Sequence, residues 1–169
     1  MKPFCWMLVG LPGVGKSTYI NDRIRERTIK YAVLSSDFYI EREARMQGKT
    51  YNVVFKDTVD WAQKQFFRDV THAIDQNENI IIDRTNLTVK SRAKILNLFS
   101  SDLCDYRKAA VVFQCSEALH FRRIVSRPDK IIPLQVMESM KYSFEMPTEA
   151  EGFDSITIID CDKQEDFSV

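Results

Sequence analysis

The chain has 169 residues, of which 44% are hydrophobic and 28% are charged, as is usual for a globular protein. This length favours a single domain over residues 1–169, with a core large enough to need neither a metal nor a disulfide. Lys plus Arg number 24 and Asp plus Glu number 24, so the overall positive charge of many nucleic-acid-binding proteins is absent and any such contact must come from local patches.

Apolar runs of strand length alternate with helical patterns along the chain. Strands are expected over 4–10, 31–35, 79–83, 108–115 and 155–160. Helices are expected over 16–28, from 38 onward, over 58–75, over 89–99, from 117 to about 127 and from 133 onward. This alternation predicts an α/β three-layer sandwich, with a central parallel sheet of about five strands and helices on both faces. In such sheets ligands bind beyond the carboxyl ends of the strands.

A glycine-rich segment, GLPGVGKST, lies between the first expected strand and the first expected helix and fits G-x-x-x-x-G-K-[ST]. Its glycines allow backbone N–H groups to face a phosphate chain, and the helix N-terminus adds partial positive charge. Lys16 can reach the β- and γ-phosphates, and Ser17 can hold Mg²⁺. The segment predicts a P-loop site for ATP or another nucleoside triphosphate, formed by Gly10, Gly13, Val14, Gly15, Lys16, Ser17 and Thr18.

Aspartates follow three of the apolar runs: Asp37, Asp83 and Asp160. A phosphoryl transfer needs a carboxylate near the acceptor hydroxyl and control of charge around Mg²⁺. Asp37 and Asp83 are candidates because they follow the second and third strands. Alternatively, Asp37 could be the N-cap of a helix that begins at Phe38, and Asp83 a simple turn residue. Asp160 is expected at the sheet edge, in a solvated tail.

Two groups of basic residues could contact phosphates. Arg123 and Arg127 share a helical face just before Pro128, which suits a helical lid over about 123–133 that closes on the donor phosphates. The alternative is a basic helix end that complements its own dipole. The acid-free stretch 84–101 contains Arg84, Lys90, Arg92 and Lys94, which could contact acceptor phosphates or form a solvated helix face.

The cysteines Cys5, Cys104, Cys115 and Cys161 form no CxxC pair, and with two histidines they do not suggest a zinc site. Reduced thiols in a cytoplasmic protein are expected. The apolar run after Lys2 is short and leads into the glycine-rich segment, so it is not interpreted as a signal peptide. Nothing approaches the roughly 20 apolar residues of a membrane span, so no membrane partner is expected.

Four segments together resemble the P-loop kinase domain of phage-type polynucleotide 5′-kinases: GLPGVGKST, LSSDFY, IIIDRTNLT and RRIVSRPDKIIPLQVMESM. The resemblance implies an adenylate-kinase-type sheet and an ATP- and Mg²⁺-dependent transfer of the γ-phosphate to the 5′-hydroxyl of DNA or RNA, in nucleic-acid repair. It implies that Asp37 is the general base, that Asp83, Thr85 and Asn86 line the acceptor site beside Arg84, and that Arg127 clamps the donor phosphates. Lys16, Asp37 and Arg127 are thus the expected catalytic residues.

Two features depart from that family and leave other hypotheses open. The family often has an arginine three residues after the base, where this chain has Ile40, and the nearest arginines are Arg42 and Arg45. The phosphatase domain that often follows is not expected, so a phosphatase or ligase partner would be a separate protein. MKYSFEMPTEAEGFD resembles the kinase-like region of heterogeneous nuclear ribonucleoprotein U, which suggests a non-catalytic ATP-binding module. A small-molecule kinase is a third hypothesis.

Overall fold

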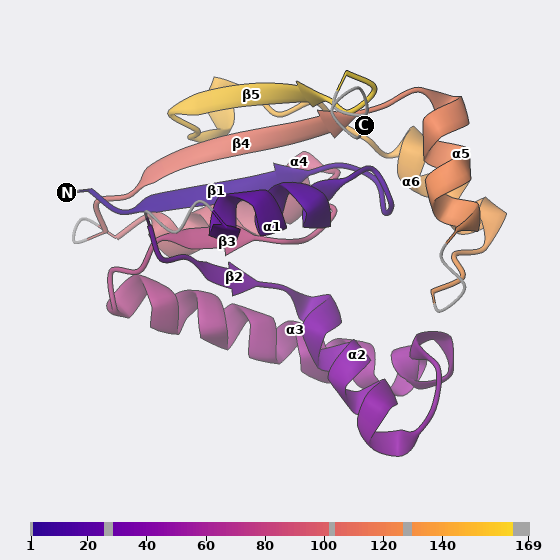
Figure 1. Ribbon diagram of the computed structural model, residues 1–169. Helices are drawn as coiled ribbons and strands as arrows, with labels where there is room; N and C mark the ends of the chain where they lie inside the picture. Colours follow the sequence, from indigo (N-terminus) through magenta and orange to yellow (C-terminus); the bar gives the residue numbers. More distant parts are fainter. Residues whose placement is uncertain (1, 26–28, 102–103, 127–129, 164–169) are drawn as a thin grey trace.

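The computed structural model describes residues 2–25, 29–101, 104–126 and 130–163 (Figure 1). Within these residues, five parallel strands form one sheet in the order β2-β3-β1-β4-β5. The strands are β1 (Phe4–Val9), β2 (Ala32–Leu34), β3 (Ile80–Ile82), β4 (Arg107–Gln114) and β5 (Ser155–Asp160). The predicted α/β fold with a parallel sheet of about five strands is therefore confirmed.

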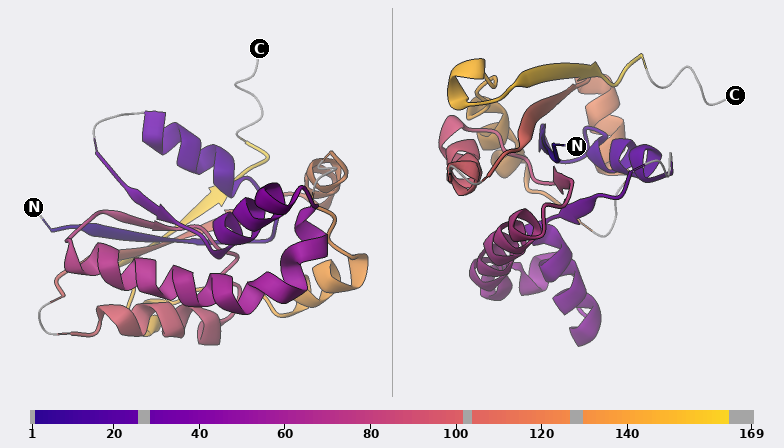
Figure 2. Two further views of the ribbon diagram at one scale, coloured as in Figure 1. Left: turned by 90° about the horizontal axis from the view of Figure 1, so that it is seen from below. Right: turned by 90° about the vertical axis from the view of Figure 1, so that its left-hand side faces the viewer.

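Helices cover both faces of the sheet. They are α1 (Lys16–Arg25), α2 (Ser36–Gln47), α3 (Tyr51–Asp75), α4 (Val89–Leu96), α5 (Glu117–Val125) and α6 (Leu134–Tyr142). Two short 3₁₀ turns, η1 (Asn97–Phe99) and η2 (Glu149–Glu151), lie in the connections. In the view along the strands in Figure 2, α1 lies on one side of the sheet while α3 and α4 lie on the other.

The core is split by the sheet into two apolar layers. Met7 and Val9 of β1 face the layer that contains α3 and α4, whereas Leu8 faces the layer that contains α1 and α5. The three isoleucines of β3 are fully buried, because this strand pairs on both sides and is covered on both faces. The apolar strand runs of the sequence are therefore buried parallel strands, as predicted.

Two helix starts differ from the sequence prediction, and both differences bear on the site. Helix α2 begins at Ser36 after the N-cap Ser35, so Asp37 lies in the first turn and the N-cap alternative for Asp37 is wrong. Helix α3 begins at Tyr51 instead of Thr58. This longer start brings Tyr51 to Asp37, to which its hydroxyl donates a hydrogen bond of 2.8 Å.

The strand order gathers the predicted loops at one end of the sheet. Strand β1 is central, between β3 and β4, and the carboxyl ends of all five strands point to the right in Figure 1, where α2, α5 and α6 also lie. Asp160 ends the edge strand β5, as predicted. All four cysteines are free thiols. In the described parts of the chain, no helix combines the length and apolarity needed to cross a bilayer.

Candidate active site

The glycine-rich segment forms a tight loop between β1 and α1. Gly13 and Gly15 have φ values of +82° and +121°, in the region that favours glycine. A Cβ at Gly13 would lie 2.7 Å from Cδ1 of Ile124, and one at Gly15 would lie 3.1 Å from Nη1 of Arg123. The loop therefore requires glycine for its backbone conformation and for the close approach of α5.

Helix α5 holds this loop through two hydrogen bonds. The Nε2 atom of His120 lies 2.8 Å from the carbonyl oxygen of Pro12, and Nη1 of Arg123 donates to the carbonyl oxygen of Val14 at 2.6 Å. Arg123 thus binds the loop backbone and does not line the adjacent cavity, which differs from its predicted contact with the donor phosphates. Its predicted companion, Arg127, lies outside the described residues.

His120 is a loop-positioning residue that sequence reasoning missed. Its helical spacing from Arg123 and Ile124 places all three on one face of α5, and all three contact the loop. That spacing was visible in the sequence and could have identified His120.

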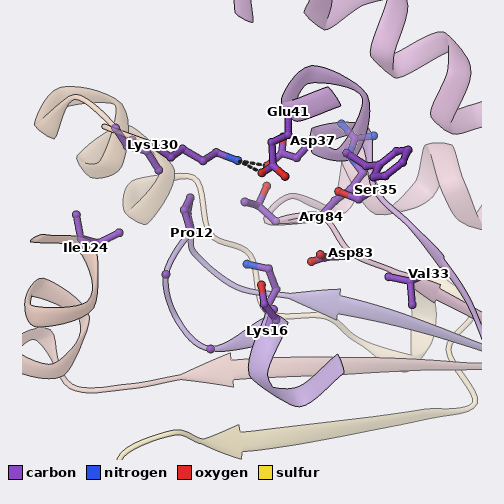
Figure 3. A pocket seen from close by; sticks show the side chains of 16 residues that line it. Pro12, Lys16, Val33, Ser35, Asp37, Glu41, Asp83, Arg84, Ile124 and Lys130 are labelled. Atoms are coloured by element: carbon purple, nitrogen blue, oxygen red, sulfur yellow. Dashed lines mark hydrogen bonds and ion pairs between the residues drawn. The ribbon is translucent and has the colours of Figure 1, made fainter. Parts of the chain in front are cut away.

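A cavity of about 450 Å³ opens above the loop (Figure 3). Lys16 and Ser17, at the N-terminus of α1, line its floor, and Asp83 reaches it from the end of β3. The Nζ atom of Lys16 donates to the carbonyl oxygens of Gly10 and Leu11, each at 2.9 Å. A cation and a helix N-terminus on one floor provide the positive end that a phosphate chain requires.

A second cavity, of about 500 Å³, adjoins the first but contains no residue of the glycine-rich loop. Apolar side chains form much of its wall, among them Ile40 from α2, Phe55 and Val59 from α3, and Val136 and Met140 from α6. The residues that line both cavities are Asp37, Asp83, Arg84, Thr85, Lys130 and Ile132. The site thus has two chambers that meet at a polar boundary.

Asp37 is held at that boundary by two donors. The Tyr51 hydroxyl donates a hydrogen bond to Oδ1 of Asp37, and the ammonium of Lys130 contacts Oδ2. The same ammonium lies 3.9 Å from Oε1 of Glu41 and 4.0 Å from the centre of the Tyr51 ring. Burial, followed by the charge of Asp37, raises the pKa of Tyr51, which keeps the phenol protonated as a donor.

Lys130 is the second site residue that the sequence did not reveal. It follows the end of α5 and meets Asp37 from a part of the chain more than ninety residues later. No motif or periodicity connects the two positions. Lys130 and Ile132, which lie within the predicted 123–133 segment, line both cavities.

The polar residues after β3 divide into two roles. Asp83, Arg84 and Thr85 line both cavities. The Arg84 guanidinium lies 4.8 Å from the centre of the Phe66 ring, and burial lowers its pKa, although the charge of Asp37 acts in the opposite direction. Asn86 instead is 3% exposed, adopts a φ of +48° and donates to the carbonyl oxygen of Leu8 at 2.7 Å, so its amide serves the fold and lines neither cavity.

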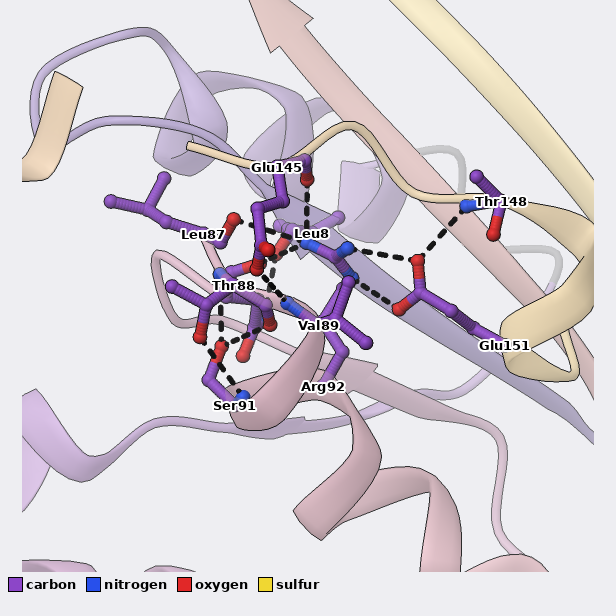
Figure 4. Close-up of polar contacts among 10 residues, drawn as sticks. Leu8, Leu87, Thr88, Val89, Ser91, Arg92, Glu145, Thr148 and Glu151 are labelled. Atoms are coloured by element: carbon purple, nitrogen blue, oxygen red, sulfur yellow. Dashed lines mark hydrogen bonds and ion pairs between the residues drawn. The ribbon is translucent and has the colours of Figure 1, made fainter. Parts of the chain in front are cut away.

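Arg92 also differs from the prediction, as Figure 4 shows. It is fully buried, with Nε and Nη2 donating to the two carboxylate oxygens of Glu151 at 2.7 and 2.8 Å. Its Nη1 donates to the backbone carbonyls of Asn86, Leu87 and Glu145. The predictions that Arg92 could contact acceptor phosphates or lie on a solvated face are therefore wrong, because its guanidinium is buried and donates to Glu151 and to backbone carbonyls. Lys90 and Lys94 remain exposed on α4.

The oxygen ligands of the first cavity suit Mg²⁺. The Ser17 hydroxyl and the Asp83 carboxylate both line it, and Mg²⁺ commonly takes one or two protein oxygens together with phosphates and water. Within the described ranges, no cluster of three or more His, Cys, Asp or Glu side chains could hold a metal by itself.

The sequence matches a known family of P-loop domains. The sequence profile of the AAA domain family matches residues 5–147. The chain belongs to that family. P-loop domains of this kind bind nucleotides, and typically Mg²⁺ with them.

Solved structures share the fold. A kinase candidate from Chloroflexus aurantiacus has a TM-score of 0.73 at 14% identity, covering 99% of this chain and 90% of that chain. A chain of the Pnkp1/Rnl/Hen1 RNA repair complex has a TM-score of 0.63 at 24% identity, covering 90% of this chain but 47% of that chain. A gluconokinase from Sinorhizobium meliloti has a TM-score of 0.57 at 14% identity, covering 94% of this chain and 82% of that chain. At these identities the similarity establishes a P-loop kinase fold but no acceptor.

Proposed function

We propose that this protein is an ATP-dependent polynucleotide kinase that transfers the γ-phosphate of ATP to the 5′-hydroxyl of DNA or RNA. The observation that carries the proposal is the position of Asp37, on the boundary between the cavity above the phosphate loop and a second cavity. A module that only binds ATP needs neither a second cavity nor a carboxylate where the two meet. A phosphotransferase needs both.

The donor side of the proposed site uses residues 10–18. The backbone N–H groups of the loop and the ammonium of Lys16 hold the β- and γ-phosphates, and the loop keeps its shape because α5 holds it at Pro12 and Val14. Ser17 and Asp83 would hold Mg²⁺, which when bound neutralises charge on the phosphates. Arg127, from the lid, is proposed as a further cation on the transferred phosphate.

The acceptor side uses Asp37 as the general base. The 5′-hydroxyl oxygen forms a bond to the γ-phosphorus while the bond from that phosphorus to the β,γ-bridging oxygen breaks. The hydroxyl proton passes to Asp37, ADP departs and a 5′-phosphate remains. Tyr51 and Lys130 hold the carboxylate on the boundary, where it can reach a hydroxyl in the second cavity.

The lining of the second cavity favours a nucleotide acceptor over a free sugar. Its wall contains Phe55, Val59 and Met140 together with the ring of Tyr51, which suit the flat apolar face of a base. A free sugar has no flat apolar face to pack against these side chains. The similarity to a chain of an RNA repair complex supports a role in nucleic-acid repair.

A small-molecule kinase is the second candidate. Its support is the similarity to a gluconokinase and a second cavity, of about 500 Å³, that can hold a small metabolite. A non-catalytic ATP-binding module has no comparable support in this site, because it leaves the placement of Asp37 unexplained.

An acceptor panel separates these functions. The protein is incubated with labelled ATP, Mg²⁺ and, in turn, a 5′-hydroxyl oligodeoxynucleotide, a 5′-hydroxyl oligoribonucleotide, the same oligomers with a 5′-phosphate, a nucleoside and gluconate. We expect label on the 5′-hydroxyl oligomers and none on their 5′-phosphorylated counterparts. Transfer to gluconate alone would establish the small-molecule kinase, and hydrolysis or binding of ATP without transfer to any acceptor would contradict both kinase functions.

A further inference from the structure

We infer that Asp162 is a positioning residue for the phosphate loop. Its carboxylate fixes the start of α5, and α5 in turn holds the loop in the conformation that binds a triphosphate. Asp162 lies just after β5, in the stretch that the sequence predicted to be a solvated tail, and it lines neither cavity. This role concerns the donor site and does not depend on which acceptor receives the phosphate.

Two hydrogen bonds join Asp162 to Ser116, the N-cap of α5. Oδ2 of Asp162 accepts from the backbone N–H of Ser116 at 2.6 Å, and Oδ1 accepts from the Ser116 hydroxyl at 2.6 Å. Because the hydroxyl proton points to Asp162, the hydroxyl oxygen can accept from the N–H of Leu119 at 3.3 Å, which forms the cap. The carboxylate also complements the partial positive charge of the helix N-terminus. Asp162 therefore fixes both the backbone and the side chain of the cap.

The turns of α5 that follow this cap contact the phosphate loop. His120 lies one turn after Ser116 and contacts the carbonyl oxygen of Pro12, and Arg123 lies about one turn further on and donates to that of Val14. Helix α5 has nine residues and is about 13 Å long, so its cap and its loop contacts belong to one short element. A shift of the cap therefore moves both side chains relative to the loop.

The loop packs closely against α5 and against the end of β5. The positions that a Cβ would take at Gly13 and Gly15 lie 2.7 Å from Ile124 and 3.1 Å from Arg123, respectively. Cys161, next to Asp162, is 2% exposed, and its Sγ lies 3.5 Å from the same position at Gly15. In Figure 1 the arrowheads of β4 and β5 end side by side, with α5 beyond them. Movement of α5 or of the end of β5 therefore has to displace the loop.

A second aspartate provides a matched control. Asp154 precedes β5 and accepts a hydrogen bond of 2.7 Å from the backbone N–H of Lys108, near the start of β4. Asp162 makes the equivalent contact after β5, beyond the end of β4. Both aspartates are exposed and link the same two strands, but Asp154 lies at the end of the sheet away from the loop. Its removal therefore has a similar effect on the fold without disturbing α5.

The test measures dissociation constants for two ligands by calorimetry in the presence of Mg²⁺. One is the β,γ-imido analogue of ATP, and the other is inorganic tripolyphosphate, which has neither base nor ribose. The proteins are the wild type, Asp162→Ala, Asp162→Asn, Ser116→Ala, the double variant Asp162→Ala/Ser116→Ala and Asp154→Ala. Chemical denaturation of each measures any accompanying change in stability, which should be small because Asp162 and Ser116 are exposed.

We expect Asp162→Ala to weaken the binding of both ligands roughly 2- to 30-fold, the range for altered coupling between distant residues. Asp162→Asn should retain part of the affinity, because an amide oxygen can still accept from the Ser116 N–H. Ser116→Ala should also weaken binding, and the double variant should lose less than the two single losses combined, since both break the same link. Asp154→Ala should bind both ligands like the wild type.

Wild-type affinity of Asp162→Ala for both ligands would overturn the inference. A loss confined to the ATP analogue would also overturn it, because Asp162 would then contact the nucleoside, as would an equal loss in Asp154→Ala, which would indicate general destabilisation. Failure of the wild type to bind either ligand would overturn it together with the donor site. None of these measurements uses an acceptor, so a failure of transfer to every acceptor would contradict the proposed kinase function alone.

Discussion

Two ion pairs in this protein differ in solvent exposure, and the difference determines whether a ligand can contact them. Arg92 and Glu151 have side chains 0% and 8% exposed and form two parallel hydrogen bonds, while Nη1 of Arg92 donates to backbone carbonyls. Lys130 and Asp37 are 24% and 47% exposed and meet on the boundary of two cavities. The first pair is closed to ligands, and the second can be reached by them.

The role of a basic residue near a phosphate site therefore depends on the groups that it contacts. A buried arginine with a bidentate carboxylate is costly to break, because either charge left alone would be buried without compensation. A partly solvated pair contributes little to stability, and its ammonium can accept a further anion. Arg92 therefore stabilises the backbone that follows Asp83, at Asn86 and Leu87, whereas Lys130 is part of the candidate active site.

The largest expected effect comes from opening the buried pair. Arg92→Leu should lower the free energy of unfolding by about 3–5 kcal/mol, because Glu151 is left buried without its partner. Chemical denaturation measures this decrease. The double variant Arg92→Leu/Glu151→Leu should be more stable than Arg92→Leu alone, since no uncompensated charge remains. If the single variant is as stable as the wild type, the supporting role of this pair is contradicted.

In the phosphate loop, replacing Lys16 should reduce catalysis strongly and change stability little. Lys16→Ala should lower kcat roughly 10²–10³-fold, because the phosphates lose a cation in the transition state. The denaturation midpoint should stay near the wild-type value, since the Lys16 ammonium donates to the carbonyl oxygens of Gly10 and Leu11 within its own loop and joins no distant segment through them. If Lys16→Ala transfers phosphate at the wild-type rate, the assignment of the donor site to this loop is contradicted.

A smaller effect concerns the acid stability of the buried pair. Burial raises the pKa of Glu151, but hydrogen bonds from Arg92 and the Thr148 N–H together outweigh it, so the pKa in the folded protein lies below its ordinary value. A depressed carboxyl pKa stabilises the fold above the unfolded pKa, and this contribution disappears as the pH falls through the folded pKa. Acid titration of stability should therefore be steeper for the wild type than for Arg92→Leu/Glu151→Leu. Parallel curves would contradict this assignment.

The smallest effect is expected from the exposed lysines of α4. Lys90 and Lys94 line neither cavity, so they can contact only an acceptor that extends beyond the site. Replacing both with alanine should reduce the salt dependence of kcat/KM for a single-stranded oligonucleotide by about 0.7 in log–log slope for each phosphate that the variant no longer neutralises. Lys64→Ala is the matched control. An unchanged slope would confine the acceptor to the two cavities.

Much of this arrangement could be predicted from local sequence. The apolar runs identified the parallel sheet, and the glycine pattern identified the phosphate loop, because both depend on neighbouring residues. Asp37 and Asp83 could be expected near each other because parallel strands end at one edge of the sheet.

The remaining features depend on interactions between distant segments. Lys130 reaches Asp37, and Glu151 reaches Arg92, from parts of the chain that no local pattern connects. Asn86, a predicted acceptor residue, has a left-handed backbone conformation and donates a hydrogen bond to the carbonyl oxygen of Leu8. Sequence reasoning identified the residue types of the site but could not decide which of them face the ligand.

Single-turnover transfer by Asp37→Asn measures whether Asp37 acts as the general base. Asparagine keeps the size of the side chain and can still accept a hydrogen bond from Tyr51, but it cannot take the acceptor proton. With saturating ATP and a 5′-hydroxyl oligonucleotide, the rate of transfer should fall roughly 10²–10⁴-fold while the dissociation constant for ATP stays within about twofold of the wild type. A transfer rate within about twofold of the wild type would contradict the assignment of Asp37 as the base on the boundary of the two cavities.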